Sequence, residues 1–358
     1  MATKSETLLK RLTEAHGVPG YEAEVREIAV QELEGLGEIS TDGHGSVLCD
    51  LGGKGPRVLL EAHMDEVGFR VQAITSKGFL KLIGVGGWWS HVVLAQQLVV
   101  KTSAGKKYVG VVGSKPPHFL PEAERQKVMP LGEMFVDIGA SSREEVAELG
   151  VRVGDPIAPR ASFEPLARKG RYVAKAFDNR VGMAVMLEAG AKLAKMKSAN
   201  RVLLAGSVQE EVGLRGAKTL AAHARPEVAV ILEGTPADDT PGFSSDLSQA
   251  VVGGGVQIRM HDPSAIMNPN LAQLAIETAE NEKIPHQLAV RQGGGTDAGR
   301  IHLSGEGVPC VVLGVPARYI HSHNSIIDLA DYQAMLKLSV ALVKRLNASE
   351  VKKLTQYL

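Results

Sequence analysis

The sequence predicts an α/β protein, in which a mainly parallel sheet carries helices on both faces and a small β-barrel-like domain is inserted. Three observations support this fold class. Apolar strands alternate with helices towards both ends of the chain, residues 69–159 carry short strands punctuated by glycine, and 44% of the 358 residues are hydrophobic. We therefore expect an α/β domain formed by residues 1–68 and 166–358, with residues 69–165 forming a separate β-rich domain.

Two helices and a buried strand are expected in the first part of the α/β domain. Apolar residues recur at helical spacing over residues 4–16 and 21–36, with a Pro-Gly pair between them. Residues 57–62 are an apolar run that predicts a buried strand leading into His63 and Asp65. Because open α/β sheets bind ligands at the carboxyl ends of their strands, these two side chains are candidates for a functional site.

The inserted segment has a different pattern. Short alternating runs such as residues 97–101 and 108–112 predict strands of a small barrel or sandwich, and one helix is expected at residues 142–149. We interpret Trp88 and Trp89 as core residues or interface anchors, with direct substrate contact as the less favoured alternative.

From residue 172 onwards, strands and helices alternate again. We expect strands at residues 172–175, 202–208, 228–232 and 308–313 and helices at residues 179–195, 214–223, 270–281 and 331–346. These elements would complete a mainly parallel sheet that is covered on both faces.

Charge and cysteine content exclude several classes of function. The chain has 40 basic and 40 acidic residues and no long run of like charge, so neither nucleic acid nor an anionic membrane is indicated as a partner. No apolar segment approaches the ~20 residues of a membrane span, and residues 1–12 lack the features of a secretory signal. Cys49 and Cys310, interpreted as buried thiols, fit a reduced cytoplasmic protein with small or peptidic partners.

Two clusters indicate the halves of a hydrolytic metal site. His63 and Asp65 point to the same side of a strand, so the imidazole could bind a divalent metal while the carboxylate orients it. Glu210 and Glu211 follow the apolar strand at residues 202–208, where one carboxylate could bind metal and the other act as general base. The alternatives are an ordinary His–Asp hydrogen bond and an exposed acidic turn.

Further candidates follow other strands. Asp178 precedes the helix at residues 179–195, where helix capping alone would explain it and bridging two metal ions is the alternative. Glu233 follows the next strand, and a His-x-His pair occupies residues 321–323, a spacing that does not decide which histidine binds. Residues 292–298 contain a glycine loop that either holds a substrate oxygen or is a conformational turn.

Five motifs, taken in order, resemble the tetrahedral aminopeptidases, the glutamyl-aminopeptidase-like di-metal exopeptidases. The resemblance covers nearly the whole chain and rests on residues 62–69, 176–180, 209–217, 293–298 and 318–322. It implies two divalent metal ions per subunit, zinc or cobalt with manganese also suitable. One ion would be held by His63, Asp178 and Glu211, and the other by Asp178, Glu233 and His321. Glu210 would be the general base for a water shared by both metals, and Asp65 would orient His63.

The same resemblance implies function and assembly. It implies a cytoplasmic aminopeptidase for short peptides, with a same-fold deacylase or amidohydrolase, a glycan hydrolase and a non-catalytic scaffold as weaker alternatives. The inserted domain would mediate dimer formation, six dimers would close into a tetrahedral dodecamer, and the segment around His118 would contact a neighbouring active site. The preferred amino-terminal residue and the native metal stay open.

Overall fold

The fold was obtained as a computed structural model that describes residues 3–196 and 199–357. Its centre is a nine-stranded sheet in the order β1-β2-β12-β3-β13-β17-β14-β15, with β16 paired to β14. The four central strands, β12, β3, β13 and β17, are mutually parallel, as predicted, and antiparallel strands flank them. The strands are β1 (Glu38–Thr41), β2 (Val47–Asp50), β3 (Arg57–His63), β12 (Arg201–Ser207), β13 (Val228–Pro236), β14 (Val256–Asp262), β15 (Ala265–Ile266), β16 (His286–Val290) and β17 (Cys310–Ala317).

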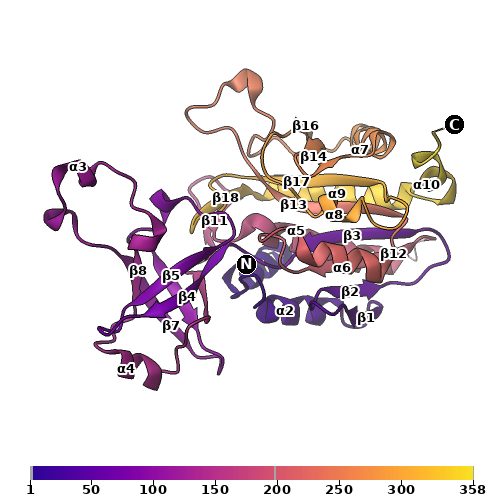
Figure 1. Cartoon of the computed structure of the whole chain (residues 1–358). Coiled ribbons are helices and arrows are strands. Elements are labelled where there is room, and N and C mark those ends of the chain that lie inside the picture. The colour runs from indigo at the N-terminus through magenta and orange to yellow at the C-terminus, as the bar shows by residue number, and fades with distance from the viewer. Residues whose placement is uncertain (1–2, 197–198, 358) are drawn as a thin grey trace.

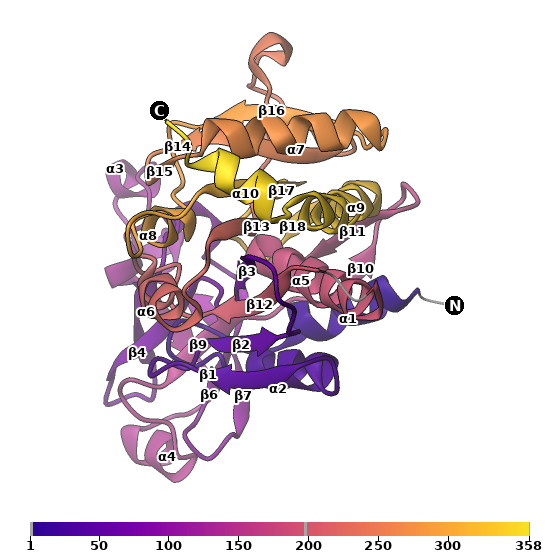
Figure 2. The same ribbon diagram turned by 90° about the vertical axis from the view of Figure 1, so that its right-hand side faces the viewer.

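Helices cover both faces of this sheet, which confirms the predicted fold class (Figure 2). The central strands are buried along nearly their whole length because each face packs against a hydrophobic cluster. One face carries α1 (Lys4–Glu14), α2 (Ala23–Leu33), α5 (Phe177–Met196), α7 (Pro269–Asn281), α9 (Leu329–Arg345) and the short α10 (Ala348–Leu354), and the other carries α6 (Arg215–Ala224) and α8 (Ala298–Ile301).

The inserted segment forms a closed six-stranded barrel beside the α/β domain (Figure 1), with the strand order β4-β5-β8-β7-β6-β9 and a hydrophobic core of its own. The predicted helix is present as α4 (Arg143–Glu148), capped by the Ser142 side chain, and a further one-turn helix, α3 (Glu122–Arg125), was not predicted. The barrel strands are β4 (Gly68–Ile74), β5 (Leu80–Val85), β6 (Gln97–Lys101), β7 (Lys107–Gly113), β8 (Phe135–Asp137) and β9 (Pro156–Pro159).

A small three-stranded sheet joins two segments that are far apart in the sequence. It pairs β10 (Glu164–Pro165) with β11 (Arg171–Ala174) and β11 with β18 (Ser325–Asp328), all antiparallel. The strand expected at residues 172–175 therefore belongs to this sheet and not to the parallel one. The domain limits at residues 68 and 165 remain a prediction.

Several elements differ from the sequence-based expectation. The strand predicted at residues 228–232 continues to Pro236, because its pairing with β17 runs on to the contact of Pro236 with Ala317, so Glu233 lies inside the strand. The flanking strands β1, β2, β14, β15 and β16 were not predicted, since each is short or depends on pairing with a distant segment. Among the described residues, no helix is long and apolar enough to span a membrane.

Candidate metal centre

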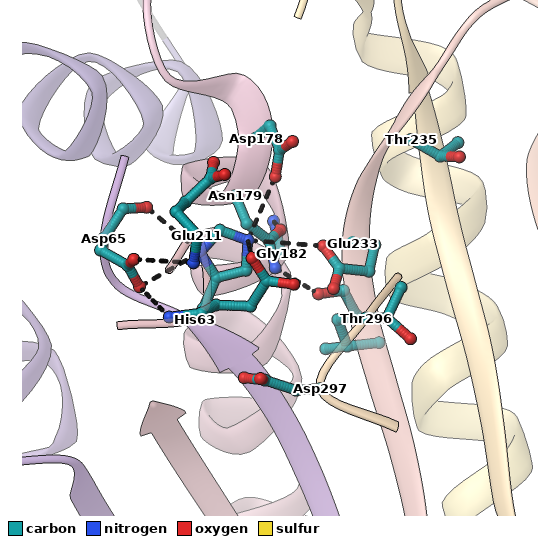
Figure 3. Close-up of polar contacts among 12 residues, drawn as sticks. His63, Asp65, Asp178, Asn179, Gly182, Glu211, Glu233, Thr235, Thr296 and Asp297 are labelled. Carbon is teal, nitrogen blue, oxygen red and sulfur yellow. Dashed lines mark hydrogen bonds and ion pairs between the residues drawn. The ribbon is translucent and has the colours of Figure 1, made fainter. Parts of the chain in front are cut away.

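The expected side chains converge at the carboxyl end of the parallel strands. His63 ends β3 opposite Ser207, the last residue of β12, so the turn that follows β12 brings Glu210 and Glu211 beside it. Figure 3 shows Glu233 on the neighbouring strand β13 and Asp178 at the start of α5. His321 lies in the turn after β17.

One aspartate joins the two histidines. The Nε2 nitrogen of His63 lies 3.1 Å from Oδ1 of Asp178, and the Nε2 nitrogen of His321 lies 3.3 Å from Oδ2 of the same carboxylate. A different glutamate lies beside each histidine. Glu233 Oε2 is 3.7 Å from Nε2 of His63, whereas Glu211 Oε2 is 3.3 Å from Nε2 of His321. Asp178 thus lies between two imidazoles, each with its own glutamate.

Both imidazoles present the same nitrogen to this cluster. Nδ1 of His63 lies 3.1 Å from the Asp65 carbonyl oxygen, and Nδ1 of His321 lies 2.9 Å from the Gly87 carbonyl oxygen. A carbonyl oxygen only accepts, so each Nδ1 carries the proton of its hydrogen bond. The Nε2 lone pair of each ring is thereby left to face the carboxylates, as a metal ligand requires.

Asp65 contacts other groups besides His63, the one residue that it was expected to orient. Its carboxylate oxygens accept hydrogen bonds from the backbone N–H of Glu210 at 3.0 Å and of Glu211 at 3.1 Å, and Oδ1 lies 3.5 Å from Nδ1 of His63 (Figure 3). One fully buried side chain therefore connects the turn that carries both glutamates to the strand that carries His63.

The capping interpretation of Asp178 is wrong. Asp178 and Asn179 have non-helical backbone angles, and the side-chain oxygen of Asn179 accepts the hydrogen bond from the Gly182 N–H at 3.0 Å. Asn179 therefore caps the helix, and this leaves the Asp178 carboxylate free to face His63 and His321. The peptide bond between Asp178 and Asn179 is cis.

Left-handed backbone angles gather around these motifs. Non-glycine residues rarely adopt positive φ, and they keep it only where the surrounding structure holds them. Ala176, Gln209, Leu214, Tyr319 and His321 have φ between 56° and 58°, and each is a candidate ligand or lies within three residues of one. The strained backbone therefore lies in the segments that position the candidate ligands.

The local electrostatics favour bound cations. Burial, together with neighbouring carboxylates, raises the pKa of Glu210 and of Glu233 well above the usual value, although His63 acts in the opposite direction. Burial lowers the pKa of His321, but Glu211 and Asp178 outweigh it and raise that pKa to about 11. Without cations, this cluster can relieve its excess negative charge only by taking up protons.

The residues present fit two divalent cations. Asp65, Asp178, Glu210, Glu211 and Glu233 supply five carboxylates against two imidazoles, and Oε1 of Glu211 is buried without a hydrogen-bond partner. Ligand atoms of His63, Asp178 and Glu211 lie within 4.8 Å of one another, and so do those of His63, Glu210 and Glu233. Nitrogen and carboxylate ligands of this kind suit zinc, cobalt or manganese.

A cavity of about 360 Å³ opens onto the cluster. Gly294, Gly295 and Thr296 line it, which favours the substrate-loop interpretation of the glycine segment. Arg259 of β14 also lines it and was missed from the sequence, where a single basic residue inside an apolar strand was the available signal. Its guanidinium donates to Thr235 Oγ1 at 2.7 Å and lies 3.3 Å from the Asp262 carboxylate.

His323 is placed outside the cluster. It is buried, and its Nε2 lies 3.0 Å from the Gln97 carbonyl oxygen in the barrel segment. Of the two histidines in the His-x-His pair, His321 therefore faces the carboxylates and His323 does not.

Comparison with known proteins identifies relatives of this chain. A family model described as M42 glutamyl aminopeptidase matches residues 45–338, and one described as AMPT matches residues 3–28. The glutamyl aminopeptidase of Lactococcus lactis subsp. cremoris is 34% identical over 354 residues, 98% of each chain. A TET aminopeptidase structure from the marine sediment archaeon Thaumarchaeota archaeon SCGC AB-539-E09 shares 42% identity, with a TM-score of 0.95 over 98% of this chain and 99% of that chain. The Pyrococcus horikoshii TET1 peptidase, described as able to assemble into a tetrahedron or a large octahedral shell, shares 32% identity, with a TM-score of 0.87 over 96% and 100%.

Proposed function

The chain belongs to the M42 glutamyl aminopeptidase family, and we propose that it removes amino-terminal residues from short peptides with two divalent metal ions. The observation that carries this proposal is the pair of imidazoles on the two oxygens of Asp178, at 3.1 and 3.3 Å. A carboxylate shared in this way is the arrangement that two neighbouring cations need.

The distances favour one assignment of ligands. His63, Asp178 and Glu233 would hold one ion, and His321, Asp178 and Glu211 the other. This assignment exchanges the two glutamates relative to the one that the resemblance implies, because Glu211 lies beside His321 and Glu233 beside His63. When bound, the ions supply Lewis acidity that polarises the peptide carbonyl and lowers the pKa of water.

Glu210 is the proposed general base. Its Oε2 lies 3.9 Å from Nε2 of His63, farther than the corresponding oxygens of Asp178 and Glu233, and its side chain faces the cavity. There it would accept a proton from the attacking water and return it to the leaving amine nitrogen as the peptide bond breaks. Asp65 would keep this carboxylate in place through the backbone N–H of Glu210.

Assembly and location follow as further proposals. We propose a homo-oligomer built from dimers, with a twelve-subunit tetrahedron as the assembly. The tetrahedron described for the Pyrococcus horikoshii relative and a related structure described as a dodecamer, 32% identical to this chain, support this proposal. Cys49 and Cys310 are both buried and unpaired, which supports a reducing compartment, the cytoplasm.

Metal removal and amine blocking test the proposal together. Purified protein should release amino-terminal residues from short peptides, lose this activity with a chelator, and regain it when Zn²⁺ or Co²⁺ is added. Acetylated versions of the same peptides should not be cleaved, because an aminopeptidase requires the free amine. Chelator-insensitive turnover would refute the metal mechanism, and cleavage of the acetylated set would point instead to a deacylase or amidohydrolase.

A further inference from the structure

A second cavity adjoins the metal centre on the side of the barrel. Its volume is about 800 Å³, and it shares Gly87, Ile320 and His321 with the catalytic cavity. The contact between Nδ1 of His321 and the Gly87 carbonyl oxygen, at 2.9 Å, therefore stands on the boundary between the two spaces. The two cavities are thus neighbours on either side of this contact.

The walls of the second cavity are rich in aromatic side chains. Trp88, Trp89 and His91 follow β5 on one side, and Tyr319 lies on the other, while none of the described lining residues is a carboxylate, a lysine or an arginine. The Trp89 and Tyr319 side chains are 65% and 55% exposed. Large aromatic residues that are exposed side by side at a cavity are typical of a binding surface.

The boundary between the cavities is held in a fixed position. Tyr319 and His321 both have positive φ, and the Ser322 hydroxyl closes their turn by donating to the Tyr319 carbonyl oxygen at 2.6 Å. A Cβ on Gly87 would lie 3.2 Å from Nδ1 of His321, so a larger residue would require this close approach to widen by a few tenths of an ångström.

Trp88 and Trp89 differ in their surroundings. The Trp88 ring stacks on Phe69 of the barrel core with centroids 4.6 Å apart, and its indole N–H donates to the Gly68 carbonyl oxygen at 2.9 Å. Trp88 thus fits the core interpretation that the sequence favoured for both tryptophans. Trp89 lies on this fixed base, contacts His91 at a centroid distance of 4.4 Å, and leaves most of its surface open.

We infer that the second cavity binds the part of the substrate that follows the scissile bond, with an apolar or aromatic second residue lying on Trp89. This inference rests on the proposed aminopeptidase function. The first residue of the peptide would occupy the cavity of about 360 Å³ at the metal centre, and the leaving part must then continue past His321. The aromatic wall beyond it matches an apolar side chain, and none of its described residues is a carboxylate, a lysine or an arginine.

Peptide pairs that differ only in the second residue test this inference. For a first residue that the wild type cleaves, kcat/KM is measured for the anilide, for a tripeptide with Gly second and for one with Phe second. The wild type should favour Phe over Gly by about tenfold, the size of one good aromatic contact. In Trp89→Ala this ratio should fall to about one, mainly through KM, and Trp89→Phe should keep most of it.

Phe243→Ala is the matched control, because Phe243 is also an exposed aromatic residue, at 59%, and does not line either cavity. This variant should keep the wild-type ratio. A wild type that cleaves the anilide but treats Gly and Phe alike would overturn the subsite and leave the aminopeptidase function standing, whereas failure to cleave any of the three substrates would overturn both. A Trp89→Ala variant that keeps the ratio but changes its mass by light scattering would show that the cavity is an interface between copies.

Discussion

Replacing Glu210 and Glu211 one at a time by glutamine separates a proton carrier from a metal ligand. The two residues are adjacent and share the Asp65 clamp on their backbone N–H groups, so each variant keeps the same turn. Glu211 Oε2 lies 3.3 Å from Nε2 of His321 and its Oε1 is buried without a partner, whereas Glu210 Oε2 lies 3.9 Å from the nearest imidazole nitrogen. These distances favour Glu211 as the proposed ligand and Glu210 as the proposed base.

The expected magnitudes differ accordingly. A positioned general base contributes roughly 10² to 10⁴ in rate, so Glu210→Gln should lower kcat by about that factor, equivalent to about 3–5 kcal/mol of transition-state stabilisation. Its bound metal should stay at the wild-type level. Glu211→Gln should bind less metal per subunit, since an amide replaces a charged ligand, and should recover part of its activity at higher metal concentration.

The assay combines kcat on an aminoacyl anilide, metal per subunit by emission spectrometry, and particle mass by light scattering. Mass should be unchanged in both variants, because neither side chain contacts the barrel surface through any described hydrogen bond. A fully metal-loaded Glu210→Gln variant that keeps more than about a tenth of wild-type kcat would refute the base assignment. Equal metal loss in both variants would make Glu210 a ligand.

Three other predictions concern groups around the centre. Asp65→Ala should weaken metal binding by about 10- to 100-fold, because it releases His63 and the Glu210–Glu211 turn, and a metal titration followed by activity measures this; unchanged affinity would contradict the clamp. Arg259→Met should raise the kcat/KM ratio of a Lys-anilide over a Glu-anilide by about tenfold, since it removes the cation that lines the cavity and repels a basic side chain; a constant ratio would show that Arg259 does not face the first side chain. Burial of His16, followed by the charges of Lys175 and Lys101, lowers its pKa to about 3, so the folded protein holds it neutral while the unfolded chain takes up a proton below pH 6.5. The contribution of His16 to the free energy of unfolding should therefore be fully present above that pH and fall by about 2 kcal/mol between pH 7.5 and pH 5. His16→Leu should remove this loss, as measured by urea unfolding of the metal-free protein. An identical pH dependence in both proteins would show that His16 is not responsible.

The sequence by itself determined the central strands of the sheet, most of the longer helices and the positions of most candidate ligands along the chain. An apolar run identifies a buried strand such as β3, and the polar residue that follows it must emerge at the end of the sheet where parallel strands meet. His63, Glu210 and Glu211 could be placed in this way because only local spacing is needed. The barrel was predicted for a similar reason, since short runs punctuated by glycine are a local pattern.

The partners of these residues were decided only by the tertiary structure. Which glutamate lies beside which histidine depends on the order β12-β3-β13-β17 and on the path of the turn after β17. Local spacing favoured a capping role for Asp178, and the fold gives that role to Asn179. Arg259 reaches the cavity at the metal centre because β14 pairs with β17. Trp89 lines the second cavity because Gly87, in the barrel segment, contacts His321. Contacts between segments so distant in sequence have no local signal, because their geometry is set by the packing of the whole chain.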